Sequence, residues 1–235
     1  MKNWLEIWNN RKPLKKLNTL DDHQALSHLL RLDGFDSPTG ELNSKNWISF
    51  VDEIINRFKL NSSSSIYEVG CGSGAFLYPF YNKSIKVGGN DYSKSLVDAS
   101  KLIMPKGKFD LIEAVKIDTQ IKYDYVVSFS VFFYFPDYKY AERCIISMYE
   151  KSKKGVIVFD VPDVDHKAEC EIFRRGALSQ SEYDKKYDGL NHLYYSKIFF
   201  EKIAKKLNVK KHFFEKQNIE DYVNNKYRFN VYFLK

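Results

Sequence analysis

The segment IYEVGCGSGAF, at residues 66–76, constrains the fold of this chain more than any other part of its sequence. A short run of strand-forming residues leads into three glycines, at positions 70, 72 and 74, and then into a helical pattern. This order predicts a buried strand, a glycine turn and a helix, an arrangement that binds nucleotide-containing ligands at the carboxyl edge of a parallel sheet. The spacing Gly70-x-Gly72-x-x-Ala75 also fits the permissive dinucleotide fingerprint. The segment alone therefore leaves the kind of cofactor open.

The rest of the chain after residue 65 alternates between strand-like and helical patterns. The expected strands are residues 66–69, 85–89, 108–112, 125–129, 156–161, 210–215 and 228–234, and the expected helices lie near residues 75–81, 94–103, 138–151, 168–177 and 197–207. Such alternation predicts an α/β fold with a doubly wound, Rossmann-like sheet. About a dozen residues separate the last two strands, so these should form an antiparallel pair at one edge.

Two segments are expected to cover a ligand site. Residues 1–43 are interpreted as an N-terminal helical lid or extension, and residues 44–235 as the main domain. Residues 32–40 (LDGFDSPTG) have two glycines and a proline, a composition typical both of a closing lid and of an ordinary turn. The other covering segment is FRRGALSQSEYDKKYDGLNH, residues 173–192, which carries Arg174 and Arg175 as a candidate anion site.

The composition, 44% hydrophobic and 29% charged, is that of a globular protein. The net charge of +7 would suit a nucleic-acid or other anionic partner, but the lysines stand mostly in scattered pairs, which favours a solvated surface. The cysteines, Cys71, Cys144 and Cys170, lack metal-ligand spacing and fit a reducing compartment. No apolar run reaches membrane-spanning length. We therefore expect a cytoplasmic protein without a metal and without a membrane partner.

Glu68, two residues before the first glycine, distinguishes between the two cofactor signatures. A carboxylate there would repel a pyrophosphate, and it would suit a ligand that presents an ammonium group and hydroxyls. S-adenosylmethionine offers such an ammonium, together with a carboxylate that can lie against the helix N-terminus. Asp91 ends the second strand and is placed to accept hydrogen bonds from both ribose hydroxyls. These residues favour the sulfonium cofactor.

Four segments together resemble the class I S-adenosylmethionine-dependent methyltransferases of the small-molecule branch. IYEVGCGSG resembles the first motif of that family, GGNDYS the second, LIEAVKID the third and YDYVVSFSVFFYFPD the fourth. The resemblance covers roughly residue 44 to the C-terminus and implies a seven-stranded mixed sheet in the order 3-2-1-4-5-7-6 with strand 7 antiparallel. In the third segment, Ile112-Glu113 stands where a small residue followed by aspartate is common. The cofactor-binding residues that the resemblance implies are Glu68, Gly70, Cys71, Gly72, Gly74, Asp91, Tyr92, Glu113, Ala114, Ser128, Phe129 and Ser130.

The acceptor is expected to be a small molecule. Methylases of exocyclic base amines carry an Asn/Asp-Pro-Pro-aromatic signature after the fourth strand, where this chain reads SFSV, and no Pro-Cys pair is present for cytosine methylation. We expect methyl transfer to a hydroxyl of a sugar, a phosphate-bearing compound or a secondary metabolite, with an anionic acceptor as one option. The alternatives are an RNA or other nucleic-acid methyltransferase and a catalytically inactive cofactor-binding partner subunit.

His192 is the candidate general base for such an O-methylation, because it follows the fifth strand and an ordinary histidine accepts protons near neutral pH. The competing interpretation is a capping or packing histidine. The candidate substrate-binding residues are Tyr194, Tyr195, Asp163 and Arg228, with Arg228 either clamping a phosphate or carboxylate or solvating an edge strand.

Overall fold

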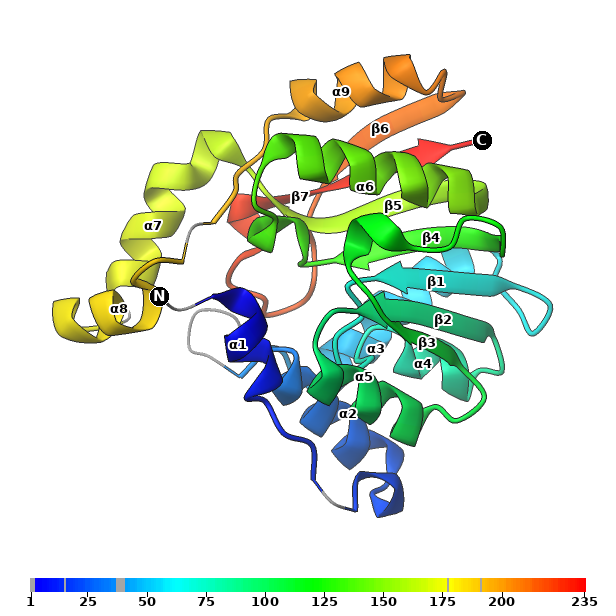
Figure 1. Cartoon of the computed structure of the whole chain (residues 1–235), viewed down its shortest axis with the longest axis horizontal. Helices are drawn as coiled ribbons and strands as arrows, with labels where there is room; N and C mark the ends of the chain where they lie inside the picture. Colours follow the sequence, from blue (N-terminus) through cyan, green and yellow to red (C-terminus); the bar gives the residue numbers. More distant parts are fainter. Residues whose placement is uncertain (1–2, 15, 37–40, 177, 191) are drawn as a thin grey trace.

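The computed structural model describes residues 3–14, 16–36, 41–176, 178–190 and 192–235. Within these residues a seven-stranded sheet runs in the order β3-β2-β1-β4-β5-β7-β6 (Figure 1). Strands β1 to β5 are parallel to one another, whereas β7 pairs antiparallel with both β5 and β6. This confirms the predicted doubly wound, Rossmann-like sheet, its strand order and the antiparallel pair at its edge.

The elements lie close to the expected ranges. The strands are β1 (Ser65–Val69), β2 (Lys86–Asp91), β3 (Lys108–Leu111), β4 (Tyr123–Phe129), β5 (Ser152–Pro162), β6 (Lys211–Lys216) and β7 (Arg228–Leu234). The helices are α1 (Trp4–Asn9), α2 (Asp22–Leu32), α3 (Ser44–Arg57), α4 (Tyr78–Asn82), α5 (Lys94–Ile103), α6 (Tyr138–Lys151), α7 (Lys167–Gly176), α8 (Gln180–Tyr187) and α9 (Lys197–Lys206).

Helices cover both faces of the sheet and bury a hydrophobic core on each. On one face, α2 to α5 pack against the sheet, with Trp47 of α3 fully buried beside Phe129 of β4. On the other face, α6 and α9 bury Ile145 and Phe200 against β4, β5 and β7. Because the central strands are covered on both sides, they read as nearly continuous apolar runs.

The N-terminal helices pack onto the domain and are tied to it by side-chain hydrogen bonds. Tyr78 of α4 donates to Asp22 of α2 at 2.8 Å, and Ser93, which precedes α5, donates to Asn9 of α1 at 3.0 Å. Helix α2 also contributes to the core that α3 to α5 share. Of the loop interpreted as either a closing lid or an ordinary turn, residues 37–40 lie outside the described residues.

Two elements differ from the expectations. Helix α4 begins at Tyr78, so residues 75–77, the predicted start of this helix, form turns instead. Helix α8 was not predicted, although its start carries a clear signal, since Ser179 and Glu182 form a capping box. The predicted end of α7 at residue 177 lies outside the described residues. No helix within the described ranges is both long and apolar enough to cross a bilayer.

Candidate active site

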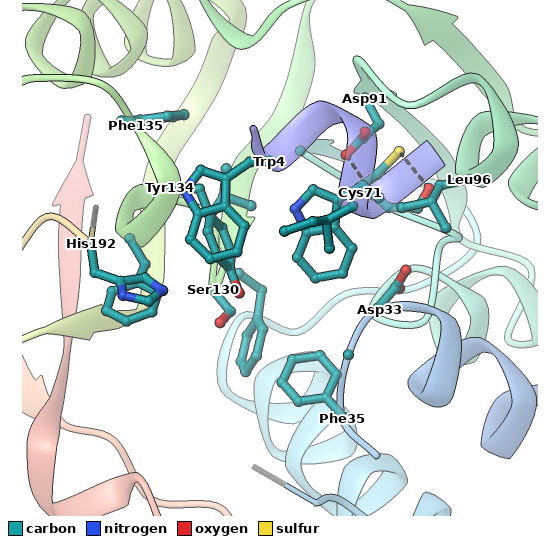
Figure 2. A pocket seen from close by; sticks show the side chains of 18 of the residues that line it. Trp4, Asp33, Phe35, Cys71, Asp91, Leu96, Ser130, Tyr134, Phe135 and His192 are labelled. Atoms are coloured by element: carbon teal, nitrogen blue, oxygen red, sulfur yellow. Dashed lines mark hydrogen bonds between the residues drawn. The ribbon is translucent and has the colours of Figure 1, made fainter. Parts of the chain in front are cut away.

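A cavity of about 490 Å³ opens where β1, β2 and β4 end. Further walls come from α1, from the end of α2, from α7 and from the described residues between α7 and β7, among them Leu190, His192 and Tyr222. Figure 2 shows Asp33, Cys71 and Asp91 at one end of the cavity, His192 at the other, and Trp4 of α1 between them. The cavity lies at the carboxyl edge of the parallel strands, where open α/β sheets bind their ligands.

The glycine turn after β1 has the conformation that only glycine adopts easily. Gly70 and Gly72 have φ angles of 73° and 53°, and a Cβ at Gly70 would lie 2.6 Å from Cγ2 of Val131. The backbone N–H groups of Gly70 and Cys71 both donate to the carbonyl of Asn90, at 2.9 and 2.8 Å. Trp47 donates through Nε1 to the carbonyl of Ala75 at 2.9 Å. The turn is therefore anchored to β2 on one side and to α3 on the other.

Asp33, at the end of α2, accepts hydrogen bonds from the backbone N–H groups of Ser73 and Ala75 in the glycine turn. Its carboxylate accepts from the N–H groups of Ser73 at 2.6 Å and Ala75 at 3.2 Å, while Ser73 Oγ donates to the carbonyl of Leu29 at 3.1 Å. We expected the carboxylate of a bound cofactor to lie against these donors as the start of a helix. In the structure Asp33 already accepts from these two donors and α4 begins only at Tyr78, so the position of the cofactor carboxylate stays a prediction.

Three carboxyl groups, those of the buried Glu68 and Asp91 and of the half-buried Asp33, form what we call the acidic end of the cavity. Burial raises the pKa of Asp33 to about 7, against the hydrogen bonds from Ser73 and Ala75, and it raises the pKa of Asp91 to about 6. Burial, followed by the charges of Asp33 and Asp91, holds the pKa of Glu68 well above its usual range.

Glu68 Oε2 has no hydrogen-bond partner among the described residues. Within the same residues, no group of three or more His, Cys, Asp and Glu side chains is arranged to hold a metal ion. Asp91 accepts from the N–H groups of Gly72 at 3.0 Å and Ser93 at 2.8 Å, yet its side chain still lines the cavity. The acidic end is therefore suited to an organic ligand that brings a positive charge and hydroxyl donors.

Most of the predicted cofactor-binding residues line the cavity, namely Glu68, Gly70, Cys71, Gly72, Asp91, Tyr92, Glu113, Ala114, Phe129 and Ser130. Two do not. Ser128 is fully buried, and its hydroxyl donates to the carbonyl of Val69 at 2.9 Å, so it connects β4 to β1. Gly74 faces Met104, with which an added Cβ would overlap.

Two buried arginines and a histidine, Arg174, Arg228 and His192, form the opposite end, which we call the basic end. The guanidinium carbons of Arg174 and Arg228 lie 5.0 and 4.8 Å from the centre of the Phe133 ring, and His192 stacks on that ring at 3.8 Å. Arg174 bonds to His192 and to the hydroxyl of Tyr194. This end concentrates positive charge on an aromatic wall.

The surroundings of His192 oppose the predicted role of general base. Its Nδ1 lies 3.0 Å from Nη1 of Arg174, and because a guanidinium can only donate, the ring proton belongs on Nε2. Burial, with the charges of Arg174 and Arg228, lowers the pKa of His192 to about 2. A histidine with that pKa binds a substrate proton too weakly to serve as a base near neutral pH. His192 lines the cavity, as expected, but as a neutral hydrogen-bond donor.

The other predicted substrate-binding residues are divided between the cavity and its support. Arg228 lines the cavity. Tyr195 is fully buried, and its hydroxyl donates to the carbonyl of Phe132 at 2.9 Å, so it belongs to the core. The hydroxyl of Tyr194 accepts a hydrogen bond from Arg174 at 3.1 Å. Asp163 forms an isolated β-bridge with Tyr195, and its side chain accepts from the N–H of Asp165. None of these last three lines the cavity.

Sequence reasoning missed several residues that line the cavity. Trp4 and Trp8, one turn apart on α1, place their rings 4.6 and 5.4 Å from the ring of Tyr134. Asp33 was seen only as part of a loop. The signal for α1 was its cap, since the side chain of Asn3 accepts from the N–H of Glu6 at 2.8 Å. For Asp33 we find no signal in the local sequence.

Comparisons with known proteins agree with this architecture. The family model of the methyltransferase domain matches residues 44–212, so the chain belongs to that family. It is a class I S-adenosylmethionine-dependent methyltransferase, as the sequence resemblance predicted. Over 139 residues the chain is also 33% identical to peramine synthetase ppzA of Metarhizium rileyi (strain RCEF 4871). That match covers 54% of this chain but only 5% of the length of that protein.

Solved structures of low sequence identity share the fold. One is magnesium protoporphyrin IX methyltransferase (ChlM) from Synechocystis PCC 6803 with bound S-adenosylhomocysteine, with a TM-score of 0.58 and 15% identity over 92% of this chain and 100% of that chain. Another is the N-methyltransferase NodS from Bradyrhizobium japonicum WM9 in complex with S-adenosylhomocysteine, with a TM-score of 0.59 and 14% identity. The second match covers 92% of this chain and 99% of that chain.

Proposed function

We propose that the cavity binds S-adenosylmethionine with its ammonium group at the acidic end. The unpartnered Oε2 of Glu68 and the carboxylates of Asp33 and Asp91 supply the acceptors that such a cation needs. Asp91 would accept from the ribose hydroxyls, and Tyr92 and Ala114 would flank the adenine. The structures with bound S-adenosylhomocysteine in proteins of the same fold support this assignment.

The residues of the chain act mainly by positioning. When bound, the cofactor supplies a methyl group that is activated by the charge of its sulfonium. The aromatic side chains of Trp4, Trp8 and Tyr134 enclose the middle of the cavity and exclude water from it. Holding two reactants in line in such a site can lower a barrier by roughly 7–11 kcal/mol.

The acceptor is a small molecule that is methylated on an oxygen atom. The observation that carries this proposal is the pair of buried arginines at the basic end, Arg174 and Arg228. Two guanidinium groups in a water-poor cavity would repel a protonated amine, and they stabilise an oxygen that bears or develops negative charge.

Methyl transfer can be tested without knowing the acceptor. The protein would be incubated with trideuteromethyl-labelled S-adenosylmethionine and an extract of the source organism, separated into a small-molecule fraction and a nucleic-acid fraction. We expect the label on an oxygen of a compound in the small-molecule fraction. Label in RNA, or on a nitrogen, would contradict the proposed acceptor class. The Asp91→Asn variant provides the blank.

The affinity for S-adenosylhomocysteine should rise between pH 5.5 and 7.5. Asp91 and Asp33 have pKa values of about 6 and about 7, so at lower pH both are protonated and no longer attract the ammonium group. Binding favours the ionised carboxylates and should release protons, which calorimetry in buffers of different ionisation enthalpy detects. Asp33→Asn should remove the part of the pH dependence near pH 7. Affinity that is flat or increases toward acid would contradict the assignment of the acidic end.

His192 should stay neutral from pH 5 to pH 8, because its pKa is lowered to about 2. We expect the imidazole Cε1–H resonance of His192, assigned by its loss in His192→Gln, to keep a constant chemical shift over this range. A titration midpoint near pH 6.5 would restore the interpretation of His192 as a general base.

A further inference from the structure

Arg228 at the basic end, like Glu68 at the acidic end, lines the cavity with incomplete hydrogen bonds. The residue is 8% exposed and lines the cavity, yet its Nε and Nη1 have no hydrogen-bond partner among the described residues. Its nearest carboxylate is that of Asp160, with Oδ1 3.6 Å from Nε. A buried guanidinium without hydrogen-bond acceptors is costly, and a ligand that supplies acceptor oxygens would remove this cost.

Arg174 differs from Arg228 because its guanidinium is already held. Nη1 is bonded to His192, and Nη2 donates to the hydroxyl of Tyr194 at 3.1 Å and to Sγ of Cys170 at 3.5 Å. Arg174 therefore contributes its charge to the basic end, whereas Arg228 offers a guanidinium with unused donors.

The charges at this end fit a ligand that carries one negative charge. Arg174 and Arg228 bring two positive charges, and His192 is neutral. The carboxylate of Asp160 offsets one of the positive charges, and it is kept in place by the hydroxyl of Tyr222, which donates to Oδ2 at 3.1 Å. No lysine is among the residues that line the described cavity. One positive charge in excess at this end suits a carboxylate better than a phosphate dianion, and the ion pair of Arg228 with Asp160 still leaves Nε and Nη1 without a hydrogen-bond acceptor among the described residues.

The walls around Arg228 define the rest of the ligand. Phe133 lies under both guanidinium groups, and Phe173, Leu190 and Tyr222 also line the cavity. Apolar and aromatic walls with few polar groups favour an apolar or aromatic molecular body.

We infer that the methyl acceptor is a monocarboxylate with an apolar or aromatic body, and that its carboxylate is bound by Arg228. This inference rests on the proposed function, because it names the chemical class of the acceptor in the same cavity. Arg228 acts as a substrate-binding residue, and Arg174 is a positioning residue that supplies charge and holds His192.

The experiment measures the binding of matched probes to the protein saturated with S-adenosylhomocysteine. The probes are phenylacetate, indole-3-acetate and decanoate, their primary amides, and phenyl phosphate, titrated by calorimetry or by protein-observed NMR. We expect at least one carboxylate to bind about 10- to 100-fold more tightly than its amide, and phenyl phosphate to bind no more tightly than phenylacetate.

The variants locate the effect. Arg228→Met combined with Asp160→Asn removes the cation without leaving a buried unpaired carboxylate, and it should abolish the preference for carboxylate over amide. Arg228→Lys keeps the charge but lacks the planar fork, and it should reduce the preference about tenfold. Arg143→Met, which removes an exposed arginine of α6, should leave the preference unchanged. Unchanged binding of S-adenosylhomocysteine in each variant shows that it is folded.

The outcomes separate this inference from the proposed function. If S-adenosylhomocysteine does not bind, the proposed function fails. If it binds, the inference is overturned by amides that bind as well as carboxylates, by phenyl phosphate that binds more tightly than phenylacetate, or by the absence of carboxylate binding at millimolar concentrations. It is also overturned if the carboxylate preference persists in the variant that lacks Arg228 and the Asp160 carboxylate.

Discussion

Replacing Asp91 with asparagine should weaken the binding of S-adenosylhomocysteine by about 10²-fold. The carboxylate of Asp91 ends β2 at the cavity, and each hydrogen bond from a ribose hydroxyl to a charged acceptor contributes about 1.5–3 kcal/mol. Asparagine keeps one oxygen that can accept from the N–H of Gly72 or Ser93, so the turn should remain folded. Calorimetry gives the affinity, and thermal unfolding of the unliganded protein gives the stability.

The matched control for this prediction is Asp98→Asn. Asp98 is an exposed aspartate of α5 that forms an ion pair with Lys94, four residues before it. Its replacement should change neither the affinity nor the melting temperature appreciably. If Asp91→Asn binds the ligand as the parent does, another acid binds the ribose, and the interpretation of the second motif is wrong.

Replacing Gly72 with alanine should reduce ligand affinity by a similar or larger factor and should also destabilise the fold. Gly72 has a φ of 53°, where an alanine costs roughly 1–2 kcal/mol, and its Cβ would overlap the carboxylate of Asp33. Relieving that overlap displaces Asp33 from the N–H groups of Ser73 and Ala75. We expect the melting temperature to fall by about 2–8 °C.

Gly176→Ala provides the control for this second prediction, because a Cβ at Gly176, at the end of α7, would meet nothing within 4 Å. Its melting temperature should stay the same or rise slightly, since alanine favours helix. A Gly72→Ala protein with parental affinity and melting temperature would show that the turn and Asp33 are not coupled as the structure indicates.

The parts of the site that lie within one local pattern were predictable from the sequence. Glu68 and Gly72 are close to each other in the chain, and Asp91 ends the next strand, so a strand, a turn and a second strand suffice to bring them together. The strand order came from the resemblance to a family rather than from the periodicity of the residues. The predicted strand order and the predicted strand positions both agree with the structure. The positions could be recognised because the central strands are covered on both faces and therefore read as apolar runs.

The parts that depend on tertiary packing were not predictable. Asp33 is 40 residues before Ser73, and nothing near it in the sequence indicates that the end of α2 docks on the glycine turn. Tyr194 and Tyr195 are neighbours, and the sequence does not tell which of the two is buried beside Phe132. His192 lines the cavity, but its charge state depends on Arg174, whose position follows from how α7 packs.

The central claim is that the glycine turn and the acidic end bind S-adenosylmethionine and not a dinucleotide. Calorimetric titration of the protein with S-adenosylhomocysteine, and separately with NADH, tests it most directly. We expect one site for S-adenosylhomocysteine, with release of protons at neutral pH, and little or no heat from NADH, because the carboxylates of Asp33 and Asp91, which ionise near neutral pH, repel a pyrophosphate. Tight binding of NADH without a response to S-adenosylhomocysteine would contradict it.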